Sequence, residues 1–210
     1  MVDGTTVSAK ELLFKLFRSF SSNEIDEIFS AAVKNGLKLK LHTEQFNAIG
    51  GLDVALKHNA VSVDHLEVIK DEDIPKLSKS DTVAVLLPGV SFFLNHTYAP
   101  ARKLIEQNAI VALATDFNPG SSHISSLSLI MSLAALKMKM TIEETISAVT
   151  INPAKALCRE KSIGSIEIGK KADFSVFDTS DYSDIVYSIG TNLNCMTIKN
   201  GTIIYQNHSF

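Results

Sequence analysis

Two histidines and one aspartate of this sequence are spaced so that together they could bind a metal ion. His42 and His65 each end a short apolar run, and Asp116 lies two residues beyond the end of another such run, at Ala114. Imidazole nitrogens and carboxylate oxygens are common ligands of zinc and iron. Burying three such groups is costly unless they pair with one another or with a metal. We therefore expect His42, His65 and Asp116 to lie in one pocket.

The apolar runs that lead to these residues read as β-strands. Four such runs, at residues 37–42, 60–65, 82–87 and 110–114, are separated by stretches with helical patterns. Strands that alternate with helices form a parallel sheet, and near-continuous apolar runs are typical of strands covered on both faces. In a parallel barrel, functional groups project from the carboxyl ends of the strands. The pattern predicts an α/β fold that brings the three side chains to one edge of a sheet.

Helical patterns and turn signals divide the rest of the chain. Ser22 is the expected N-cap of a helix that runs to about Asn35. Thr141-Ile-Glu-Glu144 has the form of a capping box at the start of another helix. Periodicity predicts further helices over residues 9–20, 71–78, 98–107, 125–138 and 152–158. After residue 163 we expect a strand over 172–177 and a hairpin over 196–205 that turns at Asn200-Gly201.

The overall composition excludes several classes of protein. The 210 residues are 45% apolar and 20% charged, which is an ordinary globular mixture. The net charge of −3 gives no basic surface for nucleic acid. No apolar run reaches the roughly 18 residues of a membrane span, so we expect no membrane partner. Two cysteines are too few for a disulfide framework, and they fit the reducing cytoplasm.

Simpler interpretations exist for each candidate residue. A lone histidine at a strand end is more often a hydrogen-bonded histidine than a metal ligand. Asp116 could have no other role than to cap the turn that follows it. The segment 118–122 (Asn-Pro-Gly-Ser-Ser) could be an ordinary turn with a serine N-cap. It could also receive a carboxylate, because glycine permits close approach and a helix N-terminus favours an anion. The surface interpretation is favoured for His58, His96, His123, His208 and Glu67.

Four sequence motifs resemble those of one enzyme family. They are Leu39-Lys40-Leu41-His42-Thr43-Glu44-Gln45, Ser62-Val63-Asp64-His65-Leu66-Glu67, Leu86-Leu87-Pro88-Gly89 and Ala114-Thr115-Asp116-Phe117-Asn118-Pro119-Gly120-Ser121. In this order they are similar to the motifs of strands five to eight in imidazolonepropionases, and the last is the most specific. The segment 164–174 is similar to one shared by many amidohydrolases. The resemblance covers roughly residues 20–206 and implies the second half of an amidohydrolase-type (β/α)8 barrel, followed by C-terminal strands of a small β-sandwich.

The resemblance implies a metal-dependent hydrolase of histidine breakdown. The family opens the cyclic amide of 4-imidazolone-5-propanoate with water and gives N-formimidoyl-L-glutamate. By this likeness His42 and Asp116 would bind one Zn or Fe ion, and the metal would activate the attacking water. His65 would assist proton transfer or polarise the carbonyl, and Asp116 would also take the proton of the water. The substrate contacts would fall on Gln45, Asn118, Gly120 and Ser121.

The sequence also departs from the family pattern. It contains no His-x-His pair, which the family carries on its first strand, and strands one to four have no counterpart. We expect three segments: an unassigned residues 1–20, a half barrel over 21–162, and sandwich strands over 163–210. Such a chain would be a fragment or would need a partner, either a second copy or a complementing N-terminal half. Two other hypotheses stay open: a different cyclic-amide hydrolase or deaminase, and a non-catalytic half barrel.

Overall fold

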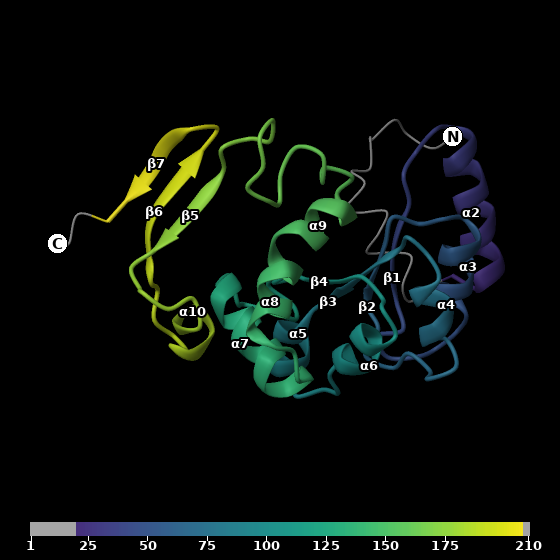
Figure 1. The fold of residues 1–210 in the computed structure, drawn as a ribbon. Helices are drawn as coiled ribbons and strands as arrows, with labels where there is room; N and C mark the ends of the chain where they lie inside the picture. Colours follow the sequence, from purple (N-terminus) through teal and green to yellow (C-terminus); the bar gives the residue numbers. More distant parts are fainter. Residues whose placement is uncertain (1–19, 208–210) are drawn as a thin grey trace.

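The chain folds around two separate β-sheets (Figure 1). The structure, a computed structural model, describes residues 20–207. The helix expected over residues 9–20 and the side chain of His208 therefore lie outside the described residues, except for Phe20. The first sheet has four parallel strands, as expected from the spacing of the apolar runs. The second has three antiparallel strands, in the region where a strand and a hairpin were expected.

The parallel sheet has its strands in chain order, β1-β2-β3-β4. The strands are β1 (Lys40–Thr43), β2 (Ser62–His65), β3 (Val83–Leu86) and β4 (Val111–Leu113). Their register places His42 opposite Asp64, Asp64 opposite Val85, and Val85 opposite Ala112. Because side chains alternate between the two faces of a strand, these four residues form one row across one face.

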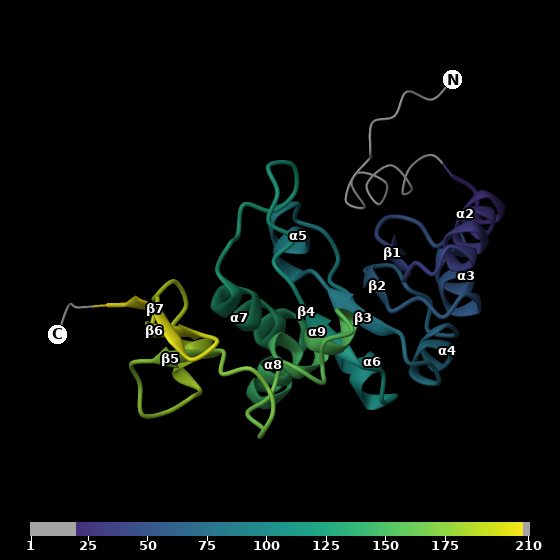
Figure 2. The same ribbon diagram turned by 90° about the horizontal axis from the view of Figure 1, so that it is seen from above.

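Helices pack beside the parallel strands and, between β1 and β4, also connect one strand to the next. They are α2 (Ser22–Lys34), α3 (Gly51–Lys57), α4 (Ile74–Ser78), α5 (Pro88–Phe93), α6 (Ala101–Glu106), α7 (Leu127–Met138), α8 (Ile142–Val149) and α9 (Ile151–Ala156). Figures 1 and 2 place α2, α3 and α4 near β1 and β2, and α7, α8 and α9 near β3 and β4. Contacts of α3 with β1, and of α8 and α9 with β4, agree with this arrangement.

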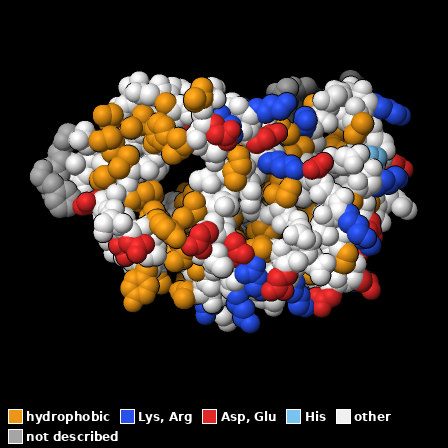
Figure 3. Space-filling model, viewed as in Figure 1, with side chains coloured by type: hydrophobic (Ala, Val, Ile, Leu, Met, Phe, Trp, Pro, Cys, Tyr) orange, Lys and Arg blue, Asp and Glu red, His pale blue; other side chains and the backbone are white. Residues whose placement is uncertain are grey.

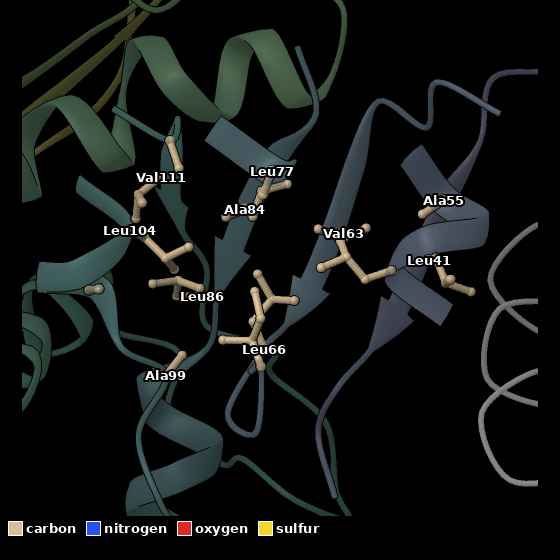
Figure 4. Packing of buried hydrophobic residues seen from close by; sticks show 14 of the residues in the cluster. Leu41, Ala55, Val63, Leu66, Leu77, Ala84, Leu86, Ala99, Leu104 and Val111 are labelled. Atoms are coloured by element: carbon tan, nitrogen blue, oxygen red, sulfur yellow. The ribbon is translucent and has the colours of Figure 1, made fainter. Parts of the chain in front are cut away.

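The main hydrophobic core lies between the sheet and its helices (Figure 4). Leu41 and Val63 are opposite each other in the register of β1 and β2, and both are fully buried. Leu86 of β3 and Leu104 of α6 continue the core, and neither is exposed at all. Burying such a side chain contributes about 1.5–3 kcal/mol, so this layer fixes the positions of the strand ends.

Helix α2 begins one residue earlier than predicted. Its N-cap is Ser21, whose hydroxyl accepts from the backbone N–H of Glu24, while the Glu24 carboxylate accepts from the backbone N–H of Ser21. The prediction of Ser22 was wrong because the capping box Ser-x-x-Glu counts back from Glu24 to Ser21. The capping box between Thr141 and Glu144 at the start of α8 is confirmed.

Two short helices were not predicted. Helix α5 starts at Pro88-Gly89, which reads as a turn, although proline also fits the first turn of a helix. Helix α10 (Asp184–Tyr187) is only four residues long and gives no periodic pattern.

The expectation that His58 lies on the surface was also wrong. Its side chain is only 12% exposed, and Nε2 lies 2.6 Å from Oδ1 of Asp26 in α2. Lys57 binds the same carboxylate at 2.8 Å. The pairing is not visible in the sequence because it joins residues more than thirty positions apart.

The antiparallel sheet has the order β5-β6-β7. Its strands are β5 (Phe174–Phe177), β6 (Asn194–Lys199) and β7 (Thr202–Gln206). The predicted hairpin turn is confirmed: Asn200 and Gly201 both have positive φ, 49° and 79°, as a type I′ turn requires.

Apolar side chains are exposed on the small sheet (Figure 3). They include Ile203, Ile204 and Tyr205 of β7. A cavity of about 670 Å³ separates this sheet from α7 and α8. Within residues 20–207 no helix has the length and apolar character needed to cross a membrane.

Candidate active site

The carboxyl ends of β1 and β2 bring two histidine rings together. The ring centroids of His42 and His65 are 5.2 Å apart, and the rings are tilted by 46°. Nε2 of His42 lies 3.7 Å from Oδ2 of Asp64, the residue opposite it in the register. Asp116 follows β4 closely enough for its charge to act on both histidines. The three predicted residues therefore gather at one edge of the sheet, together with Asp64.

Burial and neighbouring charges shift the pKa values of these groups in opposite directions. Burial lowers the pKa of His42 most, Asp64 and Asp116 act to raise it, and His65 lowers it further. Burial raises the pKa of Asp116, while His65 and His42 act against that rise. The two groups thus favour their neutral forms more than exposed groups do, which is what burial imposes on ionisable side chains.

The backbone is strained at the same edge. Glu44, His65, Leu66 and Asp116 all have positive φ, at 55°, 84°, 70° and 46°. Left-handed conformations cost non-glycine residues of order 1–3 kcal/mol each, and such residues gather at functional sites. In this structure each of them lies at or just beyond the carboxyl end of a parallel strand.

Two buried glutamates belong to this edge and were missed in the sequence. Glu67 was expected on the surface, but its side chain is only 2% exposed, and Oε1 lies 3.4 Å from Nδ1 of His65. Glu44 is buried as well, and its Oε1 accepts from Leu52 N–H and from the Thr43 hydroxyl. The Oε2 atom of each glutamate is buried without a hydrogen-bond partner among the described residues. The signal available was their position within two residues of a candidate histidine.

Asn118 organises the loop that carries Asp116. Its Nδ2 donates to the backbone carbonyl of Asp116 at 2.6 Å and to its Oδ2 at 3.3 Å. Its Oδ1 accepts from the backbone N–H groups of Gly120 and Ser121, each at 2.8 Å. The side chain of Asn118 thus stabilises the turn that holds Asp116. The segment 118–122 is therefore a turn, as one of the two interpretations of the sequence expected.

A second contact closes this loop beside the start of α5. The Ser122 hydroxyl donates to the Thr115 carbonyl at 2.9 Å, and Ser122 is fully buried. A Cβ on Gly89 would come within 3.0 Å of that hydroxyl and 2.9 Å of Ile130 Cδ1. Glycine at position 89 therefore allows the close approach of the loop that positions Asp116.

The helix expected from about residue 125 begins close to that position, so its N-terminus is not next to Gly120 and Ser121. Helix α7 starts at Leu127, and its N-cap is Ser126, five residues beyond Ser121. An anion on this loop would be bound by the turn itself and not by the helix. Gln45 is half-buried just after β1, and its substrate contact stays a prediction.

The donor atoms at this edge are of the types that bind a divalent metal, but the described residues supply too few of them to hold one. Imidazole and carboxylate groups are present, and buried carboxylate oxygens lack partners, as at sites that bind a cation. Yet residues 20–207 contain no group of three histidine, cysteine, aspartate or glutamate side chains arranged to hold an ion. The described part of the chain therefore supplies an incomplete ligand set, in line with the absence of a His-x-His pair from the sequence.

Comparison with known proteins gives close relatives by sequence. The chain is 46% identical over 186 residues to the imidazolonepropionase of Christiangramia forsetii, which covers 88% of this chain and 45% of the relative. It is 47% identical over 188 residues to the imidazolonepropionase of Treponema denticola, covering 89% and 46%. The chain thus spans slightly less than half the length of the curated relatives that it matches.

Solved structures with the same fold are more distant in sequence. An adenosine deaminase from Xanthomonas campestris with bound zinc superposes with a TM-score of 0.75 at 19% identity, over 92% of this chain and 54% of the deaminase. The guanine deaminase of E. coli gives a TM-score of 0.72 at 16% identity, over 90% and 52%. This likeness confirms the predicted α/β fold class, in which a parallel sheet is followed by a separate antiparallel sheet. The pattern of the amidohydrolase family matches residues 18–204, and the chain belongs to that family.

Proposed function

We propose that this chain forms the C-terminal part of an imidazolonepropionase-like active site. The activity is a hydrolysis that opens the cyclic amide of 4-imidazolone-5-propanoate to N-formimidoyl-L-glutamate. The observation that carries the proposal is the 46–47% identity to curated imidazolonepropionases across a segment that contains the whole strand-end cluster. The likeness to deaminase structures, at 16–19% identity, supports the fold and not the reaction.

His42 and Asp116 are the residues that would hold a Zn or Fe ion. The ion would supply Lewis-acid activation of the water that attacks the ring carbonyl. The zinc bound to the Xanthomonas campestris deaminase supports a divalent metal in this fold, and the donor types here accept either metal. The missing ligands would come from a longer polypeptide or from a partner chain.

His65 and Asp116 are the proposed proton-transfer groups. They lie close enough for the charge of each to act on the other, and both stand at the edge from which a parallel sheet presents its functional groups. Burial raises the pKa of Asp116, which brings its proton affinity closer to that needed by a general base. His65 is almost fully buried, and its ring is held beside that of His42.

Gln45 and the turn 118–121 are the proposed substrate contacts. Gln45 lies two residues beyond the end of β1, the first strand of the sheet, whereas Asp116 follows β4, the last strand. Gly120 and Ser121 lie in the turn that Asn118 closes, so their groups are held at a fixed place relative to Asp116. The propanoate arm of the substrate is an anion, which suits a turn with backbone N–H groups and hydroxyls.

The remaining half of the site requires either a longer polypeptide or a partner chain. A homo-oligomer and a complementing N-terminal half are the two arrangements we propose. Free cysteines, Cys158 and Cys195, support the cytoplasm as the place of the reaction.

A chimeric enzyme tests the function directly. The 188 residues of this chain that align with the Treponema denticola imidazolonepropionase, at 47% identity, would replace the matching segment of that enzyme. We expect the chimera to open the imidazolone ring and to lose at least a hundredfold in kcat on Asp116→Asn, since removing a general base costs about 10²–10⁴-fold.

The matched control in the chimera is Lys103→Ala, which removes an exposed ion pair with Asp71. This control should keep the rate within about twofold, because surface ion pairs contribute little. A folded, metal-loaded chimera without ring-opening activity would contradict the proposed function.

A further inference from the structure

We propose that Glu67 is a positioning residue for His65. Its carboxylate accepts a hydrogen bond from Nδ1–H of His65 and so fixes the ring in one tautomer, with Nε2 left as the nitrogen that can accept a proton. The use of Nε2 in catalysis rests on the function proposed above. The contact between the two side chains does not, and it can be measured by itself.

The geometry of the pair supports this role. Nδ1 of His65 and Oε1 of Glu67 are 3.4 Å apart, and the two side chains are only 6% and 2% exposed. Residues two apart on a regular strand point to the same face but stand side by side with no bond between them. In this structure a change of backbone direction brings the two side chains together.

That change occurs at His65 and Leu66. Both have left-handed φ, 84° and 70°, although neither is glycine, and leucine is rarely found there. Backbone hydrogen bonds hold the strained segment: Leu66 N–H donates to the Thr43 carbonyl and Val68 N–H to the Glu44 carbonyl. Strain of this kind persists only where the surroundings fix it, which points to a constraint on the side chains that it aims.

The chemistry of the two groups sets the direction of the hydrogen bond. An ionised carboxylate can only accept, so Nδ1 must be the donor. In neutral imidazole, one nitrogen carries the proton and the other is an acceptor, so a proton on Nδ1 leaves Nε2 with its lone pair. Carboxylate partners orient catalytic and metal-binding histidines in this way in many enzymes.

The sequence offers a close control in Glu44. Like Glu67 it is a buried glutamate one or two residues beyond a strand end, and its Oε2 also lacks a partner among residues 20–207. Its Oε1, however, accepts from Leu52 N–H and the Thr43 hydroxyl, and not from His65. The change Glu44→Met therefore removes an equivalent buried carboxylate without removing the proposed contact.

The test is the imidazole ¹⁵N spectrum of His65 in the 210-residue chain. It is recorded with ¹⁵N-labelled histidine at a pH above which the ring chemical shifts no longer change, so that the neutral ring is observed. We expect His65 to show the Nδ1–H tautomer. Glu67→Met should shift the ring toward the Nε2–H form, which is the more common one in water. Glu67→Gln should keep the Nδ1–H form, because its amide oxygen can still accept, and Glu44→Met should leave the spectrum of His65 unchanged.

An Nε2–H tautomer in the unmodified chain would overturn the proposal, and so would an unchanged tautomer in folded Glu67→Met. If Glu67→Met does not fold, the spectra of the unmodified chain and of Glu67→Gln test the proposal. Loss of the Nδ1–H form in Glu67→Gln would also contradict the positioning role of Glu67. These readouts do not depend on turnover. They therefore separate a failure of the positioning role from a failure of the proposed function, which the activity of the chimera reports.

Discussion

His42 and Asp64 face each other across β1 and β2, with Nε2 and Oδ2 3.7 Å apart. Their row continues through Val85 and Ala112, so the polar pair stands at one side of an otherwise apolar row. The Ser62 hydroxyl donates to Oδ1 of Asp64 at 3.2 Å and fixes the carboxylate. Asp64 is thus placed to orient His42, in addition to the residues that the sequence predicted.

The first prediction concerns zinc binding by the chain. Because the described residues offer no complete ligand group, binding should be weak. His42→Ala and Asp116→Ala should each abolish detectable binding. Asp64→Asn should weaken it about tenfold, since partners of metal-binding histidines contribute about 10–100-fold to affinity. Titration calorimetry with zinc chloride measures all three changes.

The control for zinc binding is His123→Ala. His123 is exposed and stacks on Phe93 with ring centroids 5.5 Å apart. Zinc binding that persists in His42→Ala but disappears in His123→Ala would place the ion at a different site.

The second prediction is that the 210-residue chain alone does not open the imidazolone ring. Two proposed ligands are too few to hold a catalytic ion, which takes about three protein ligands. The measurement is loss of substrate absorbance with the purified chain and added zinc or iron, with the Treponema denticola enzyme as the positive control. Turnover by the chain that disappears in Asp116→Asn would contradict this prediction. It would show that the chain itself supplies the remaining metal ligands.

The strand-end residues could be predicted because they depend on one simple rule. In a parallel sheet the carboxyl ends of all strands meet at one edge, so four apolar runs and the residues after them were enough to bring His42, His65 and Asp116 together. The alternation of strands and helices gave the parallel sheet, and the Asn-Gly turn signal gave the hairpin at Asn200-Gly201.

Glu67 was not predicted, because its contact with His65 depends on backbone strain. A strand-like residue pattern gives no sign that His65 and Leu66 turn to positive φ, and without that turn Glu67 reads as a solvated acid. The pairing of His58 with Asp26 is equally invisible, since it follows from how α2 packs beside α3. Tertiary packing decides both cases.

The third prediction concerns the outer edge of β4. Asn152 of α9 donates from Nδ2 to the Val111 carbonyl at 2.8 Å, and Val111 is 3% exposed. Asn152→Ala leaves a buried carbonyl without this partner, so the free energy of unfolding should fall by about 1–3 kcal/mol. Urea unfolding followed by circular dichroism measures the loss.

A matched asparagine gives the control for Asn152→Ala. Asn35 donates from Nδ2 to the Ala31 carbonyl at the same distance of 2.8 Å, but at an exposed position. Water can replace the bond there, so Asn35→Ala should cost less than about 1 kcal/mol. Equal losses for the two variants would mean that burial of the Val111 carbonyl is not the reason.

The fourth prediction is a dependence of stability on pH that comes from Asp26. The side-chain bond from Lys57, and then that from His58, lowers the pKa of Asp26 below its usual range. A group whose folded-state pKa is lowered stabilises the fold above its unfolded pKa, about 3.9 for aspartate, and this stability disappears as the pH falls through the folded value. Wild type should therefore lose stability below about pH 4 more steeply than Asp26→Asn.

Thermal unfolding between about pH 2 and pH 7 measures this difference. Glu27→Gln, one residue further along α2, removes the same charge and leaves the Lys57–Asp26–His58 contacts in place. It should keep the slope of the wild type. Parallel curves for wild type and Asp26→Asn would show that this carboxylate does not stabilise the fold through its charge.

The last prediction is that the chain self-associates through the edges of its parallel sheet. Within residues 20–207, β1 pairs only with β2, and β4 only with β3. An edge strand with free backbone groups is a template for another chain. The drive comes from the strand edges and not from an open core, because Leu41, Val111 and Leu113 are each at most 3% exposed.

Two copies related by a two-fold axis along the strands would place β4 of each beside β1 of the other and close eight strands, with both edges hidden at once. The Asn152 contact already occupies the Val111 carbonyl, so Asn152→Ala should increase association, provided that the variant stays folded. Light scattering over a range of concentrations tests this: the apparent mass should rise above that of the 22.9 kDa chain as the concentration increases. A constant monomer mass together with cooperative unfolding would contradict the prediction and would mean that both edges are protected within the single chain.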